Sequence, residues 1–275
     1  MFENLTTGWR IGKAIRKLVF GDKGLLVYPL ATAIAAIIEM VAIFGTFLLA
    51  SGFSSAGYIA ALIAFYVITT FTSTYLLVAM LLGFRGYTSG KRISFSQALA
   101  AAAPYSRLIL EWALFYSVVL LIIRLIESRM RGIGGLILGS AVSIGLAVAT
   151  VFVIPVIIDE KAGPIDAMKR STDFFVKNFG KSAGGLIYSD LYNLMFIIGG
   201  ILIGLLGAVI AISSTPLLGV PVFMVGFLVL IFGILMTTVM SNVFRFVLYE
   251  YMNGKKLPEG LSEELIRSSV KKKPV

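Results

Sequence analysis

Charged side chains are rare in the apolar stretches of this 275-residue sequence, so the few that occur there are the first candidates for chemistry. Glu39 lies 14 residues after Leu25 and Arg124 lies 16 residues after Leu108, which places them about 21 and 24 Å along their helices. An isolated charge in hydrocarbon is costly, so these similar depths predict an ion pair between Glu39 and Arg124. Glu127 lies one turn from Arg124 and competes for it. The alternatives are a proton- or cation-binding carboxylate at Glu39, or a position near the outer surface.

Other polar residues in the apolar stretches have no predicted partner of opposite charge. Asp190 and Asn193 share one helix face, and the nearby Tyr188 and Tyr192 indicate an aromatic belt at the membrane interface. A structural position at headgroup depth is therefore expected for Asp190, and likewise for Glu111 beside Trp112, with a cytoplasmic vestibule as the alternative.

Hydroxyl groups gather in alternate apolar stretches, where Ser73, Ser143 and Thr238 lie at similar distances from the polar segments that follow them. They could meet at one level as a polar pathway. The competing interpretation is that each hydroxyl bonds a carbonyl of its own helix or bridges two helices.

The sequence has no Cys and no His, which removes the usual nucleophiles, bases and soft metal ligands of enzymes. A paired-aspartate site is also not expected, because Asp190 is the one Asp in an apolar stretch. We therefore expect no enzyme, no cofactor and no metal site.

The composition requires a membrane environment for the elements that hold these residues. The chain is 58% hydrophobic and 14% charged with a mean hydropathy of +0.95, whereas soluble domains carry about 25% charged residues. A spanning helix needs about 20 apolar residues. Six stretches meet this requirement, namely 25–50, 58–84, 108–126, 133–158, 184–212 and 217–251.

Basic residues fall almost entirely on alternate sides of these stretches. Of the 24 Lys and Arg residues, all but Arg124, Arg129 and Arg131 lie in the two ends of the chain or in the second and fourth loops, with Arg245, where the last helix continues beyond the membrane, counted in the C-terminal end. The positive-inside rule then predicts a protein of the cell membrane with both termini in the cytoplasm. The net charge of +10 is expected to face anionic lipid of the inner leaflet rather than nucleic acid.

Short helices with one apolar and one basic face are predicted before the spanning pairs. In 163–179 apolar residues recur every three or four positions after Pro164, and Ser94 with Gln97 predicts a capping box for a helix in the second loop. The N-terminal arm has a similar pattern. The residues expected to contact lipid headgroups are Lys13, Arg16, Lys17, Lys169, Arg170 and Lys177.

These patterns predict an all-α integral membrane protein with six transmembrane helices as three hairpins, each introduced by a cytoplasmic amphipathic helix. It would form a single polytopic domain with an arm at 1–24, a six-helix bundle at 25–251 and a basic tail at 252–275. Gly200 with Gly204, and Gly135 with Gly139, are spaced for close helix approach, within one chain or between two copies.

The segment 150–171 resembles a signature from a group of prokaryotic six-span membrane families of unknown function. That group is similar to the membrane domain attached to some glycerophosphodiester phosphodiesterases. The matching residues are Pro155, Asp159, Glu160, Gly163, Pro164, Ala167 and Ser171, with Trp9 to Gly12, Asp22, Lys23, Tyr28 and Pro29 near the N-terminus. The resemblance implies the six-span layout and no activity, because the phosphodiesterase catalytic domain has no counterpart here.

The expected function is therefore non-enzymatic. An accessory or organising protein with contacts to lipid, to a membrane protein or to a second copy is favoured. The alternative is a small transporter or channel that uses Glu39, Arg124 and the hydroxyl level.

Overall fold

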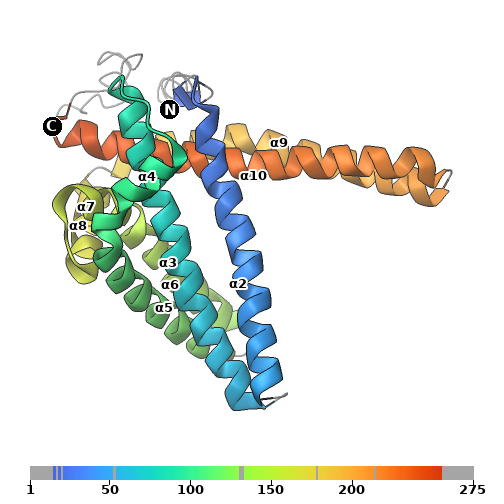
Figure 1. Cartoon of the computed structure of the whole chain (residues 1–275), viewed down its shortest axis with the longest axis horizontal. Coiled ribbons are helices and arrows are strands. Elements are labelled where there is room, and N and C mark those ends of the chain that lie inside the picture. The colour runs from blue at the N-terminus through green and yellow to red at the C-terminus, as the bar shows by residue number, and fades with distance from the viewer. Residues whose placement is uncertain are drawn as a thin grey trace. The chain divides into compact units, whose positions relative to one another are not determined.

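The computed structural model describes residues 15–255 apart from 17, 20, 52–53, 130–132, 178 and 214, and all regular secondary structure in this part of the chain is helical (Figure 1). The 3-10 helices are η1 (Lys23–Leu26) and η2 (Ala103–Tyr105). The α-helices are α2 (Val27–Ser51), α3 (Ser55–Thr88), α4 (Phe95–Ala102), α5 (Ser106–Arg129), α6 (Ile133–Thr150), α7 (Val153–Glu160), α8 (Pro164–Lys177), α9 (Phe179–Ser213) and α10 (Pro216–Met252). The predicted all-α class is confirmed.

Six segments of the described residues are long and apolar enough to cross a bilayer, in agreement with the six predicted spans. They are Lys23–Ala50, Ser55–Thr88, Phe95–Ile123, Val142–Glu160, Leu194–Ser213 and Pro216–Glu250. The chain is therefore a multi-pass membrane protein by the length and composition of its helices.

The helices form two compact units, Val27–Asn178 and the pair of segments Met1–Leu26 and Phe179–Val275. In the first unit α3 is the central helix, because it contacts α2, α4, α5 and α7. The consecutive residues Val78, Ala79, Met80 and Leu81 are all buried, which means that α3 is covered on every side at this level.

The second loop folds as its sequence predicts. Ser94 caps α4, with its Oγ accepting from the Gln97 backbone N–H at 3.3 Å and the Gln97 Oε1 accepting from the Ser94 N–H at 2.8 Å. Pro104 ends this helix in η2, after which α5 begins at Ser106. The Tyr75 hydroxyl donates to the Leu99 carbonyl at 2.8 Å and ties α4 to α3.

The fourth predicted span is not one continuous helix, which corrects the sequence-based expectation. It breaks at Val151 and Phe152 into α6 and α7. Pro155 explains the break, because proline has no N–H to donate to the Val151 carbonyl and its ring clashes with that carbonyl in a continuous helix.

The second unit contains the close pair α9 and α10, which run side by side (Figure 1). Glycines replace side chains where the two backbones meet. A Cβ atom on Gly226 would lie 2.2 Å from the Gly204 backbone N, and one on Gly200 would lie 2.6 Å from the Leu230 N. The predicted close approach at Gly200 and Gly204 is thus made within one chain.

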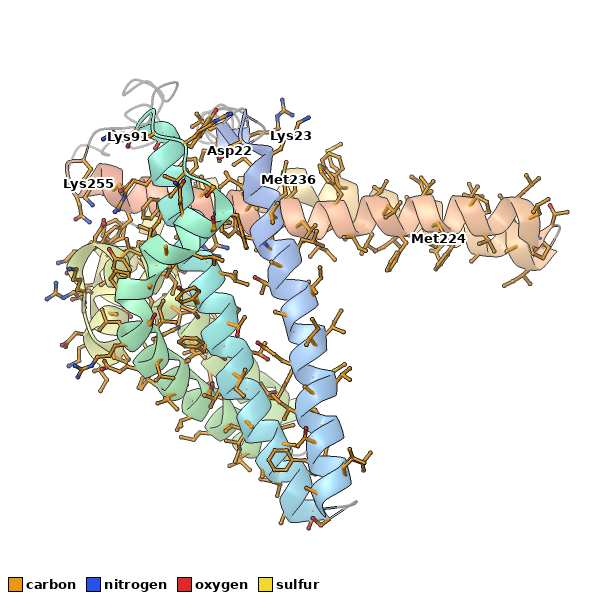
Figure 2. All side chains as sticks on the ribbon, viewed as in Figure 1. Asp22, Lys23, Lys91, Met224, Met236 and Lys255 are labelled. Carbon is orange, nitrogen blue, oxygen red and sulfur yellow. The ribbon has the colours of Figure 1, made fainter. Side chains whose placement is uncertain are left out.

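Apolar side chains project outward along this pair, including Met224, which is 48% exposed (Figure 2). Such a surface suits lipid tails and not water. Since lipid is as apolar as leucine, close van der Waals packing at small residues is the main force that holds two such helices together.

Gly200→Ala should destabilise the protein, whereas Gly199→Ala on the same helix should not. The added Cβ at Gly200 overlaps the α10 backbone, and overpacking of this kind costs about 1–3 kcal/mol. Gly199 has no atom within 4 Å of the added Cβ, so its substitution should be neutral or slightly stabilising through helix propensity. Thermal unfolding of the purified variants in detergent measures both effects, and equal midpoints would contradict the close packing.

Candidate functional site

A polar layer lies at the middle of the spans of the first unit. Glu39 on α2 accepts hydrogen bonds from two hydroxyls of α3, with the Thr72 Oγ1 2.6 Å from its Oε1 and the Thr69 Oγ1 2.8 Å from its Oε2. Glu39 is the central residue of α2 (Val27–Ser51), and Thr72 lies next to the centre of α3 (Ser55–Thr88). By rise per residue Glu39 is about 18 Å from either end of its helix, which corresponds to the middle of a bilayer.

The hydroxyls that hold Glu39 depart from the usual behaviour of threonine in a helix. A helical threonine commonly donates to the carbonyl four residues earlier. The threonines that do so here are Thr32, Thr88, Thr150, Thr172, Thr237 and Thr238. Thr69 and Thr72 are three residues apart and therefore share the face of α3 that meets α2, where they donate to Glu39 instead.

Ser117 extends the layer to α5. Its side chain is fully buried, and its Oγ lies 3.4 Å from the Thr70 Oγ1 on α3. Ser117 is also close to the middle of its helix, Ser106–Arg129. Sequence reasoning missed this residue, because one small hydroxyl in an apolar stretch produces no pattern. We define the mid-span layer as Glu39, Thr69, Thr70, Thr72 and Ser117.

The predicted hydroxyl level is satisfied locally in the described residues. The Ser73 Oγ donates to the Thr70 carbonyl at 3.1 Å, and the Thr238 Oγ1 donates to the Ile234 carbonyl at 3.0 Å. Ser143 is exposed on α6. Ser73 and Thr238 therefore have the backbone contacts of the local interpretation, and the polar pathway stays a prediction.

Several predicted residues fall where the structure gives no side-chain description. Arg124 and Glu127 lie on α5, and Asp190 and Asn193 lie on α9, but their side chains are outside the described set. The ion pair between Glu39 and Arg124 stays a prediction. Lys13 and Lys17 also lie outside the described residues, as does the tail from residue 256, whereas Arg16 is half-buried.

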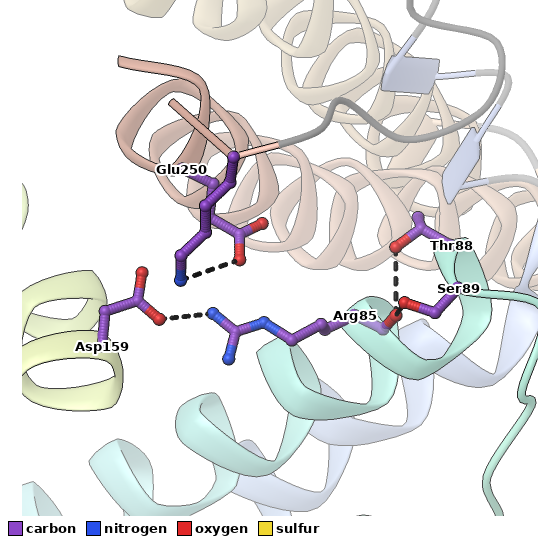
Figure 3. Close-up of polar contacts among 6 residues, drawn as sticks. Arg85, Thr88, Ser89, Asp159 and Glu250 are labelled. Atoms are coloured by element: carbon purple, nitrogen blue, oxygen red, sulfur yellow. Dashed lines mark hydrogen bonds and ion pairs between the residues drawn. The ribbon is translucent and has the colours of Figure 1, made fainter. Parts of the chain in front are cut away.

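A second polar assembly joins α3, α7 and α8. Arg85 on α3 points at Asp159 near the end of α7, with 2.5 Å between the Arg85 Nη2 and the Asp159 Oδ1 (Figure 3). The next residue, Glu160, forms an ion pair with Arg170 on α8. The Asp159 side chain is only 8% exposed, so its charge is compensated inside the protein rather than by water.

The same assembly provides a hydrogen-bond acceptor for the backbone at the break between α6 and α7. The Phe152 N–H donates to the Ser171 Oγ at 2.9 Å, and both residues are fully buried. Ala167, one turn earlier on α8, is also fully buried, and the Phe152 and Phe174 rings meet edge to face at 4.6 Å. We call Arg85, Phe152, Asp159, Glu160, Arg170 and Ser171 the α7–α8 clasp.

Six of the seven matching residues in segment 150–171 have a structural role in the clasp or beside it. Pro155 breaks the helix, Asp159 and Glu160 pair with two arginines, and Lys161 turns the chain in a left-handed conformation with φ 51°. Pro164 begins α8, Ala167 is buried on this helix, and Ser171 accepts from the Phe152 N–H at the break before α7. These residues build structure. The sequence could not identify Arg85 as a partner, because it lies 74 positions from Asp159.

The two assemblies differ in the chemistry that they can perform. The carboxylates of the clasp are engaged by arginines, whereas Glu39 is held only through neutral hydroxyls among its recorded contacts. Within the described residues, no three His, Cys, Asp or Glu side chains gather in a way that could hold a metal ion. The mid-span layer is therefore the candidate functional site, with the chemistry of one carboxylate and neighbouring hydroxyls.

Ser171→Ala should weaken the clasp by removing the acceptor of a buried backbone N–H. An unsatisfied buried donor costs about 1–3 kcal/mol, so the thermal midpoint should fall and hydrogen exchange at Phe152 should accelerate. Thr172→Ala is the matched control, since the Thr172 hydroxyl bonds only the Met168 carbonyl of its own helix among the recorded contacts. Unchanged exchange at Phe152 in the Ser171 variant would contradict this role.

Comparison with known proteins places the chain in a family but assigns it no activity. Residues 55–257 match a family described as Family of unknown function (DUF6159), a stretch that includes α3 to α10 and the whole clasp. No curated protein and no solved structure matches the chain. The similarity to the membrane domain attached to glycerophosphodiester phosphodiesterases remains a prediction from sequence. By the extent of the family match, the chain belongs to the DUF6159 family of unknown function.

Proposed function

We propose that this chain is a non-enzymatic, multi-pass protein of the cell membrane that organises or assists other membrane components through contacts with anionic lipid. Both termini would lie in the cytoplasm. The observation that carries the proposal is the two-sided surface of α8, which is fixed to the protein on one side and presents apolar and basic side chains on the other.

The inner side of α8 is held by the clasp, where Ala167, Ser171 and Phe175 are buried. On the other side, Ile165 is 55% and Val176 is 65% exposed. These two residues are 11 positions apart, which is about three helical turns, so they lie on the same side of the helix. Lys169 and Lys177 are exposed near them, together with the acidic Asp166 and Asp173. Exposed apolar residues among lysines are typical of a helix that lies in a membrane surface.

The pairing of the long helices supports the proposed arrangement of three hairpins, each introduced by an amphipathic surface helix. α2 contacts α3, α5 contacts α6, and α9 contacts α10, each pair being consecutive spans. The short helices α4 and α8 precede the second and third of these pairs in the chain. A membrane protein or a second copy would then meet the lipid-facing surface of this bundle, and nucleic acid is not expected as a partner.

Replacing both Lys169 and Lys177 by Gln should lower the preference of the protein for anionic lipid. Each lysine near an anionic surface contributes about 1 kcal/mol, or about fivefold in association. The measurement is the association of spin-labelled phosphatidylglycerol relative to phosphatidylcholine in reconstituted vesicles at low salt. Arg170→Gln should have a smaller effect, because Arg170 already pairs with Glu160.

The charge-conserving variant Lys169→Arg with Lys177→Arg is the control and should keep the preference of the wild type. If the Gln variant retained full selectivity for phosphatidylglycerol at low salt, the proposed lipid contact of α8 would be wrong.

The orientation can be tested directly, because the chain has no Cys and any introduced Cys is unique. Asp173 on α8 and Thr215 between α9 and α10 are both exposed. A membrane-impermeant maleimide should label Thr215→Cys in intact spheroplasts, and should label Asp173→Cys only after the membrane is opened. Labelling of Asp173→Cys in intact spheroplasts would reverse the proposed topology.

A small transporter or channel is the second candidate, and a different observation favours it. A carboxylate between two apolar spans at the middle of the membrane is energetically unfavourable, and such residues commonly mark proton or ion pathways. Glu39, held by Thr69 and Thr72, is a residue of this type. Transport would also require a polar pathway through the membrane, lined by Arg124 or by the hydroxyls predicted from sequence.

A further inference from the structure

Glu39 is unusual within its pair of helices. From Val27 to Phe84, α2 and α3 contain no acidic or basic residue except Glu39. It lies at the centre of α2, and its two carboxylate oxygens contact different hydroxyls, those of Thr72 and Thr69. Both carboxylate oxygens thus have a hydrogen-bond donor, although no charged group takes part in either bond.

The two threonines can serve Glu39 in either protonation state. When Glu39 is ionised, each hydroxyl donates its proton to the carboxylate, as in the structure. When Glu39 carries a proton, the acid can donate it to one threonine oxygen. That threonine hydroxyl then turns to the carbonyl four residues earlier, Phe65 for Thr69 or Ile68 for Thr72, as helical threonines commonly do. Each hydroxyl keeps a hydrogen-bond acceptor in both states.

We propose that Glu39, Thr69 and Thr72 form a proton-binding site at the middle of the membrane, in which Glu39 exchanges a proton while the threonine hydroxyls rotate. If the proton crosses the membrane, this proposal rests on the second candidate function. Binding of a proton to Glu39 does not itself require transport. It is independent of the lipid contact proposed for α8.

The competing arrangement is an ion pair between Glu39 and a basic group, so the ionisable groups on the neighbouring helices must be considered. On α3 the nearest are Tyr66 and Tyr75, and the Tyr75 hydroxyl already donates to the Leu99 carbonyl. On α5, which packs on α3, they are Arg107, Glu111, Tyr116, Arg124, Glu127 and Arg129. If Arg124 paired with Glu39 as predicted from sequence, the carboxylate would be held by a cation and not by the neutral hydroxyls alone.

A lipid-soluble carbodiimide distinguishes the two arrangements. Dicyclohexylcarbodiimide adds to a protonated carboxyl group in an apolar environment, and Glu39 is itself partly exposed on α2, so the reagent has access from the lipid side. We expect peptide mass spectrometry of the full-length protein in detergent to find modified Glu39, with a rate that falls as pH rises. Glu39→Gln should abolish the modification of this peptide.

Variants of the hydroxyls test their part in the site. Thr69→Val and Thr72→Val each remove one donor to the ionised carboxylate, so the protonated fraction at a fixed alkaline pH should rise and labelling should accelerate about tenfold. Ser73→Ala is the matched control, because the Ser73 hydroxyl bonds the Thr70 carbonyl, and it should label at the wild-type rate. Thermal unfolding of each variant shows that it is folded.

Three results would overturn the proposal. The first is no modification of Glu39 at acidic pH while a water-soluble carbodiimide still modifies Glu111, which pairs at the surface with Arg107. The second is a labelling rate that does not depend on pH. The third is protection by sodium and not by choline, which would assign the site to sodium instead of a proton.

Discussion

A polar group placed among apolar helices must find its hydrogen-bond partner within the protein, because hydrocarbon offers none. This constraint explains the polar contacts inside the apolar helices. The Phe152 N–H, freed where Pro155 breaks the fourth span, is taken by the Ser171 hydroxyl. Glu39 is satisfied by Thr69 and Thr72. Other threonines bond carbonyls of their own helices.

The same environment decides how the helices hold together. Burial of apolar surface gives little preference for another helix over lipid, so close backbone contact becomes decisive. The α9–α10 pair shows this most directly, since Gly200, Gly207, Gly219 and Gly226 leave no room for a side chain where the two backbones meet. In the first unit polar contacts supplement packing. Arg85 reaches Asp159 there, and α3 is surrounded by four other helices.

The polar residues separate into two kinds with different consequences for function. In the clasp, opposite charges compensate each other and a serine completes a broken helix, so its residues fix α8 in place and leave Lys169 and Lys177 exposed. In the mid-span layer a single carboxylate is held by neutral hydroxyls that can donate or accept. The first arrangement favours a lipid-contacting, organising protein, and the second favours proton exchange within the same bundle.

Composition and periodicity determined the helical class, the six apolar stretches and local signals such as the Ser94 capping box, because these depend on residues close in sequence. They also located Glu39 as an intramembrane carboxylate, but not its contacts. Only the tertiary structure decided that Thr69 and Thr72 hold Glu39, that Ser117 joins the layer, and that Arg85 meets Asp159. The physical reason is that these partners are 30 to 74 positions apart, and no local pattern records which helix faces meet when the chain packs.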